Sequence, residues 1–141
     1  MLQQDKYIID ILNQACVSSY KPVDTFISTS NVTMVLDCLF SDPTWFHQIV
    51  GALQYVTFIR LYNCFVVNKV CQFMHAPTYT YWVDVKRILR YLQGTFSFGL
   101  HITCSSSFAL HGFTYANCAG SVDDRKSTSG YLVFFVNTPV S

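Results

Sequence analysis

The sequence predicts an α+β fold, with helices over residues 1–95 and a short antiparallel sheet after them. Apolar residues recur at helical spacing in four stretches of the first part. In the second part the pattern changes to alternation and to continuous apolar runs, which are typical of strands. Of the 141 residues, 51% are hydrophobic and 12% are charged, so we expect an ordered chain with a real core.

The first predicted helix lies in "DKYIIDILNQAC", where apolar side chains recur at i, i+3, i+4 and i+7. Residues 17–40 show no clear period. The stretch "KPVDTFISTSN" within them is rich in Pro, Ser and Thr, and we expect it to be an extended linker.

The second predicted helix, "SDPTWFHQIVGALQYVTF", has a clear start. Ser41 or Asp42 can cap it, and Pro43 suits its first turn because the missing N–H would be unpaired there anyway. Gly51 weakens the helix, and we expect it to allow close packing in exchange.

Two further helices follow. "CFVVNKVCQFM" carries an apolar stripe that includes Cys71 and Met74, and Pro77 stops it. "TYTYWVDVKRILRYLQGT" turns Val85, Ile88, Leu89 and Leu92 inward, and its charged side chains outward. Gly94 is expected to take the left-handed conformation after the last turn.

Three strands are predicted after residue 96. Residues 98–103 alternate as in a half-buried strand, "FALHGFTYA" is a candidate second strand, and "GYLVFFVN" is a continuous apolar run. The sequence ends four residues after Asn137, before a helix could cover that run. We therefore expect an incomplete sheet with uncovered apolar surface, which favours self-association and poor solubility.

Composition excludes several classes of function. The net charge is +1, so a basic site must be local, and the eight acidic residues are all Asp, so no mechanism here can use a glutamate. Six cysteines form no C-x-x-C pair, and the four histidines are scattered, so no metal site is predicted. Neither a signal peptide nor a membrane span is found, and an intracellular location with reduced cysteines is expected.

Seven stretches, in order and in register, resemble the Pol polyprotein of copia-type retrotransposons. They are "LQQDKYIIDIL", "KPVDT", "DPTWFHQIVGALQYVT", "VNKVCQFMHAPT", "VKRILRYLQGT", "GLHI" and "AGSVDDRKSTSGY". The resemblance implies that residues 1–95 correspond to the thumb and connection of the reverse transcriptase. It also implies that residues 96–141 correspond to the first strands of the ribonuclease H domain. The family's Tyr-x-Asp-Asp polymerase motif has no counterpart here.

Catalytic carboxylates of the family are substituted in this sequence. The ribonuclease H pattern resembles Ser-Asp-Ala-Asp-Trp-Ala-Gly, and residues 114–120 are Thr-Tyr-Ala-Asn-Cys-Ala-Gly. Tyr115 therefore stands at the family's catalytic aspartate, and Asn117 at the next one. The intact family uses Mg²⁺, which prefers anionic oxygen ligands, whereas a phenol and an amide are neutral at pH 7. No catalytic residue, metal site or cofactor is predicted, and Asp123 and Asp124 are expected in a salt-bridged turn.

Other departures affect structure. Before its third helix the family usually has Thr-Arg-Pro-Asp-Ile, where this chain has Ile59-Arg60-Leu61-Tyr62-Asn63. The proline and the acidic residue suited to a helix start are both gone.

Lys86, Arg87 and Arg90 form a basic face on the fourth predicted helix. The resemblance implies weak contact with an RNA–DNA hybrid or DNA through this face, and nearby aromatics could stack on bases. The alternative is a solvated face with an Asp84–Arg87 pair. Our leading hypothesis is a non-enzymatic remnant of the polyprotein, and the runner-up is a nucleic-acid-binding module. Residual hydrolysis or polymerisation is the third.

Overall fold

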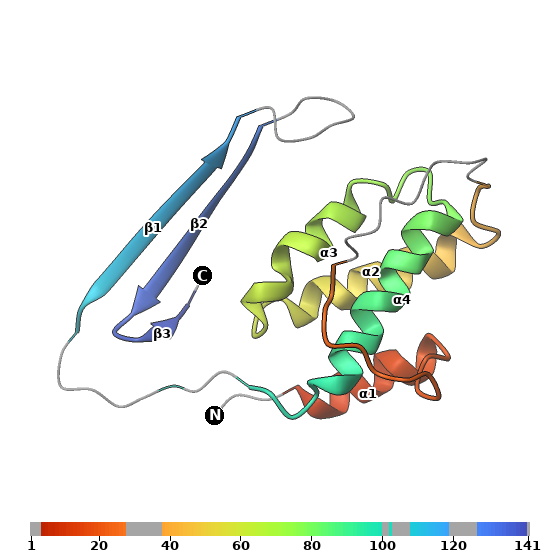
Figure 1. Cartoon of the computed structure of the whole chain (residues 1–141), viewed down its shortest axis with the longest axis horizontal. Helices are drawn as coiled ribbons and strands as arrows, with labels where there is room; N and C mark the ends of the chain where they lie inside the picture. The colour runs from red at the N-terminus through yellow and green to blue at the C-terminus, as the bar shows by residue number, and fades with distance from the viewer. Residues whose placement is uncertain (1–3, 28–37, 100–101, 103–107, 119–126, 141) are drawn as a thin grey trace. The chain divides into compact units, whose positions relative to one another are not determined.

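A computed structural model of the protein describes residues 4–27, 38–99, 102, 108–118 and 127–140. The chain divides into two compact units, Leu2–Leu100 and His101–Ser141. The elements are α1 (Asp5–Gln14), α2 (Pro43–Val56), the 3₁₀ turn η1 (Leu61–Asn63), α3 (Cys64–Cys71), α4 (Tyr79–Gly94), β1 (Leu110–Asn117), β2 (Thr128–Phe135) and β3 (Thr138–Pro139) (Figure 1). The four helices and the open antiparallel sheet of the described ranges confirm the predicted α+β class. None of the helices in the described part of the chain is long and apolar enough to span a membrane.

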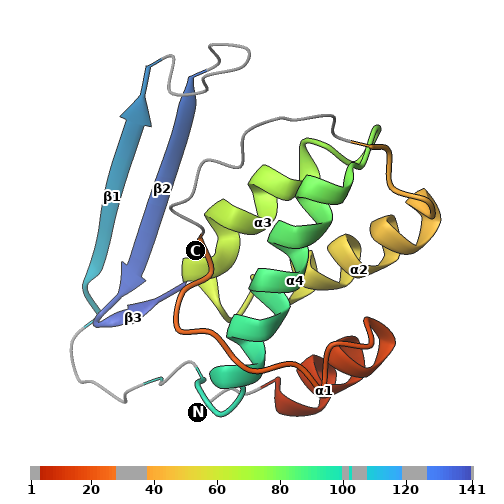
Figure 2. The ribbon, with the colours of Figure 1, turned by 45° about the vertical axis from the view of Figure 1, so that its right-hand side comes forward.

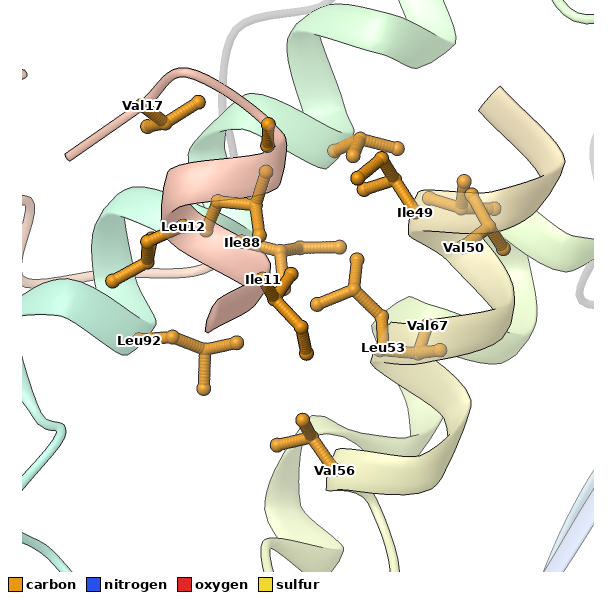
Figure 3. Packing of buried hydrophobic residues seen from close by; sticks show 14 of the residues in the cluster. Ile11, Leu12, Val17, Ile49, Val50, Leu53, Val56, Val67, Ile88 and Leu92 are labelled. Carbon is orange, nitrogen blue, oxygen red and sulfur yellow. The ribbon is translucent and has the colours of Figure 1, made fainter. Parts of the chain in front are cut away.

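The helical unit is built around one apolar core. α1 packs against α2 and α4, and α3 also packs against α2 and α4, so each helix contributes its apolar stripe to the same interior. Figure 3 shows side chains of α1, α2 and α4 converging there, among them Ile11, Leu53 and Ile88. The inward set predicted for α4, Val85, Ile88, Leu89 and Leu92, is fully buried, as periodicity indicated.

The start of α2 shows why these residues form a helix. Asp42 is the cap: its Oδ1 accepts a hydrogen bond from the backbone N–H of Trp45 at 3.0 Å, and Pro43 occupies the first turn. α3 begins differently. Without a proline at its start, the chain forms η1 and then a short helix, and Asn63 precedes that helix without a side-chain capping bond.

Residues 17–27 are irregular, as the absence of a period indicated, but they are not a free connector. Val17 is buried in the core, and the segment continues beside α4 (Figure 2). The amide of Val23 donates to the carbonyl oxygen of Arg90 at 3.4 Å, and Phe26 makes an edge-to-face contact with Tyr91. The remainder of the predicted linker, residues 28–31, lies outside the described residues, as do residues 32–37 after it.

Both glycine predictions in the helices are wrong. No glycine in the described ranges has a positive φ, and Gly94 is the last residue of α4 rather than a left-handed residue after it. A Cβ at Gly94 would lie 3.2 Å from the Cβ of Pro22, so the missing side chain lets residues 17–27 approach the helix. Gly51 allows no close packing, because a Cβ there would meet nothing within 4 Å.

The sheet has the order β1-β2-β3, with β1 and β2 antiparallel over eight residue pairs from Leu110–Phe135 to Asn117–Thr128. Two of the three predicted strands are confirmed as β1 and β2. The strand predicted at 98–103 is not formed at its described positions, Phe98, Gly99 and Ile102, and the rest of it lies outside the described residues. Large apolar side chains of the sheet are exposed, including Phe113 and Tyr131, in line with the expected uncovered surface.

Candidate functional sites

The first candidate site is the end of β1, where the sequence resemblance predicts the position of the ribonuclease H carboxylates. Tyr115 lies opposite Gly130 and Asn117 lies opposite Thr128 in the β1–β2 register. The Tyr115 side chain is 65% exposed, so the phenol lies on the surface of the sheet. Cys118 follows β1 directly, and its Sγ accepts a 3.8 Å hydrogen bond from the hydroxyl of Ser127.

The described residues bring no cluster of His, Cys, Asp or Glu side chains together around this strand or elsewhere that could hold a metal ion. Asp123 and Asp124, predicted to form a salt-bridged turn with Arg125 and Lys126, lie outside the described residues. In the described part of β1, the side chains that could offer a ligand atom are those of His111, Thr114 and Tyr115, and none of them is a carboxylate.

The second candidate site is the basic face of α4. Lys86, Arg87 and Arg90 are neighbours on this helix, and all three are half-buried rather than fully solvated. The guanidinium of Arg87 donates from Nε to the carbonyl oxygen of Thr25 at 3.2 Å and from Nη2 to the Thr25 hydroxyl at 2.7 Å. Arg90 donates from Nε to the carbonyl oxygen of Lys21 at 2.7 Å.

One turn further along α4, Gln93 donates from Nε2 to the carbonyl oxygen of Ser18 at 2.8 Å. Three consecutive side chains of one helix face therefore bind three backbone carbonyls of residues 18–25. Lys86 lies apart from this set, with its ammonium 5.6 Å from the ring centroid of the buried Trp82.

The aromatic residues near this face contact other protein groups. Trp82 belongs to a cluster with Phe40 and Trp45, and Tyr79 contacts Phe40 edge-to-face. Phe40 belongs to the segment before α2. Its backbone N–H donates a hydrogen bond to the carbonyl oxygen of Pro77 at 2.8 Å, and this bond holds the segment close to the start of α4.

Tyr81 stacks on Phe73 with centroids 3.9 Å apart, and Tyr91 makes edge contacts with Phe26 and Tyr62. The aromatics near this face that could stack on bases are Tyr79, Tyr81, Trp82 and Tyr91, and Tyr79 is the most exposed of them.

Asp84 lies on the same helix and is half-buried, not outward as predicted. Burial raises the pKa of its carboxyl above the ordinary value, and the positive charges of Lys69 and Arg87 offset that effect in part. Its carboxylate therefore weakens the positive field near Arg87.

Arg60 was missed as a structural residue by sequence reasoning. Its side chain is 1% exposed, and its guanidinium donates to the carbonyl oxygens of Thr95, Phe96 and Phe98 at 2.6–2.7 Å. It also bonds the hydroxyls of Thr95 and Tyr62 at 3.2 and 3.1 Å. One signal was present in the sequence: Arg60 is the single Lys, Arg or Asp between Pro43 and Asn68, within an apolar stretch.

Comparison with known proteins finds retrovirus-related Pol polyproteins of transposons among the relatives of this chain. The chain is 38% identical over 141 residues to the retrovirus-related Pol polyprotein from transposon RE2 of Arabidopsis thaliana, covering 99% of this chain and 10% of that protein. It is 32% identical over 152 residues to the Pol polyprotein from transposon TNT 1-94 of Nicotiana tabacum, covering 99% of this chain and 11% of that one.

A shorter relative is an uncharacterized mitochondrial protein of Arabidopsis thaliana, 39% identical over 133 residues, which are 94% of this chain and 55% of that protein. The chain thus spans about a tenth of the Pol polyproteins and about half of the mitochondrial protein. No family model matches the chain, and no solved structure matches it significantly.

Proposed function

Because this chain is homologous over nearly its full length to one segment of the Pol polyproteins of copia-type retrotransposons, we propose that it is a non-catalytic remnant of that segment. In this proposal residues 1–95 derive from the thumb and connection of the reverse transcriptase. Residues 96–141 derive from the first strands of the ribonuclease H domain. The helical unit and the antiparallel hairpin are compatible with these assignments.

The observation that carries the proposal is Tyr115 on β1. Hydrolysis of a phosphodiester by two metal ions needs several carboxylates to hold the cations close together. Mg²⁺ binds hard, anionic oxygen ligands, and a phenol with an ordinary pKa near 10 supplies no negative charge at pH 7. The residues described at this strand therefore do not fit Mg²⁺.

Binding of Mn²⁺ tests the proposal without interference from contaminating nucleases. Titration of the purified chain, followed by electron paramagnetic resonance, is expected to show no pair of bound ions. The matched variant Y115D/N117D places two carboxylates on β1 and is expected to gain Mn²⁺ affinity. Two bound ions in the unsubstituted chain would contradict the proposal.

Cleavage of an RNA–DNA hybrid and primer extension provide the second test. With Mg²⁺ or Mn²⁺ both activities are expected to stay at the background of a mock purification. The variant D123N/D124N, purified in parallel, is the control, because activity from a host enzyme is the same in both preparations. Activity that survives purification and falls in the variant would mean that the chain is an enzyme.

A further inference from the structure

Residues 18–26, here called the strap, occupy the basic face of α4. Four side-chain hydrogen bonds join the face to the strap: two from Arg87 to Thr25, one from Arg90 to Lys21 and one from Gln93 to Ser18. The strap returns one bond, from the amide of Val23 to the carbonyl oxygen of Arg90.

These bonds are of a kind that an anion can replace. All four side-chain bonds lie at the surface, and every acceptor on the strap is a neutral carbonyl or hydroxyl oxygen. A guanidinium binds a phosphate through shorter, charge-assisted bonds that are about twice as strong as those to neutral acceptors. Phosphate groups would therefore compete with the strap for the same donors.

Charge on the strap neither adds to this competition nor opposes it. The strap carries Lys21 and Asp24, both exposed, so its own charges cancel. When the strap lies on α4, Asp24 is part of the segment that covers the cationic face. Asp84 is part of α4 itself. Movement of the strap would uncover both guanidinium groups and carry Lys21 and Asp24 away together, so the net charge near the two arginines would not change.

We propose that the strap is a displaceable cover of a phosphate-binding face made by Arg87 and Arg90, and that a nucleic-acid backbone opens it. This inference goes beyond the proposed loss of catalysis and does not depend on it, since it concerns binding alone. Its immediate consequence is that the full chain binds nucleic acid more weakly than its arginines would allow.

Gly94 offers a way to lift the strap without changing any charge. A Cβ at this position would lie 3.2 Å from the Cβ of Pro22, so Gly94→Leu is expected to push the strap off the helix. Gly51→Leu is the matched control, because the same side chain placed on α2 meets open space. Thr25→Val is a milder second variant that removes one acceptor of Arg87 and preserves size.

Binding to an RNA–DNA hybrid over a range of salt is the first measurement, with folding checked by tryptophan fluorescence. Release of two arginines should steepen the slope of log K against log salt by about 2, since each neutralised phosphate contributes ~0.9. G94L is expected to show this steeper slope and tighter binding at low salt. T25V should change in the same direction by less, and G51L should match the unsubstituted chain.

Hydrogen exchange of a peptide covering the strap is the second measurement. Saturating hybrid should speed exchange in the strap of the unsubstituted chain and leave a peptide from α2 unchanged. R87A/R90A should show fast strap exchange without hybrid and no binding. The proposal is overturned by equal slopes for G94L and G51L, by strap exchange that hybrid leaves unchanged, or by no binding in any variant at about 50 mM salt.

Discussion

The guanidinium of Arg60 donates from Nη1 to the carbonyl oxygen of Thr95 at 2.6 Å, joining two positions 35 residues apart. Thr95 follows the last turn of α4, where backbone carbonyls lack partners within the helix and the helix dipole is negative. The same guanidinium binds the carbonyl oxygens of Phe96 and Phe98, so one buried cation fixes the chain as it leaves α4.

Arg60→Met should destabilise the helical unit by about 3 kcal/mol, because it leaves one buried and two partly buried carbonyl oxygens without this donor. Arg60→Lys should recover only part of the loss, since an ammonium cannot reproduce the planar fork of donors. The measurement is urea unfolding followed by the fluorescence of Trp45 and Trp82, which pack together in this unit. Arg90→Met, at a surface hydrogen bond, is the control and should cost about 1 kcal/mol. Equal losses for the two methionine variants would contradict a special role for Arg60.

Asp42→Ala should lower the free energy of unfolding by about 1 kcal/mol, because the amide of Trp45 loses its acceptor at the start of α2. Asp42→Asn should retain most of the stability, since the amide oxygen can accept the same bond. Ser41→Ala is the control and should have little effect, because Asp42 is the residue that caps. The same urea titration measures all three.

Glycine-to-alanine substitutions at Gly51 in α2 and at Gly94 in α4 should differ in their effect on the free energy of unfolding. Gly51→Ala is expected to stabilise α2 by about 1 kcal/mol, as alanine is the better helix former and the added methyl meets open space. Gly94→Ala should gain less or lose stability, because its methyl would press on Pro22. Thermal unfolding of both variants decides the point, and an equal gain at the two positions would show that the strap does not pack against Gly94.

Asp84→Asn should stabilise the helical unit at pH 7 and lose this advantage in acid. Burial raises the pKa of Asp84 in the folded state, so over the interval between the two pKa values the unfolded chain holds fewer protons. Rising pH across that interval therefore lowers the stability of the unsubstituted chain, whereas the asparagine variant is unaffected.

The difference between the two chains should shrink as the pH falls and vanish at about pH 2, well below the ordinary Asp pKa of about 3.9, where Asp84 is protonated in both states. Urea titrations at neutral and acid pH measure this, with Asp10→Asn on the exposed side of α1 as the control. A stabilisation that persists unchanged in acid would assign the effect to something other than ionisation.

Much of the helical unit could be predicted because its signals are local. The spacing of Ile8, Ile11 and Leu12 fixes the buried face of α1, and the cap and proline before α2 fix where that helix begins. The prediction of a strand at 98–103 was wrong because a long-range contact, which local alternation does not reveal, holds this segment. Alternation at Phe98 and Ile102 resembles a strand, but Arg60 holds the carbonyl of Phe98, and the first strand of the sheet starts at Leu110.

The candidate sites divide in the same way. The identity of Tyr115 and Asn117 follows from the sequence, since the side chain at a position is what carries or lacks charge. The groups that Arg87 and Arg90 bind could not be predicted from the sequence, because a cationic helix face has the same pattern whether it contacts solvent, phosphate or protein. Arg90 bonds a carbonyl 69 residues away, and no local pattern encodes that distance.

By itself, the sequence determined the order of the four helices, the positions of β1 and β2 and the chemical character of β1, because periodicity and residue type act over a few neighbouring positions. Only the tertiary structure decided what the arginines bind. Arg60, Arg87 and Arg90 each bind at least one backbone carbonyl brought near by the packing of the core, and a backbone carbonyl leaves no mark in the sequence.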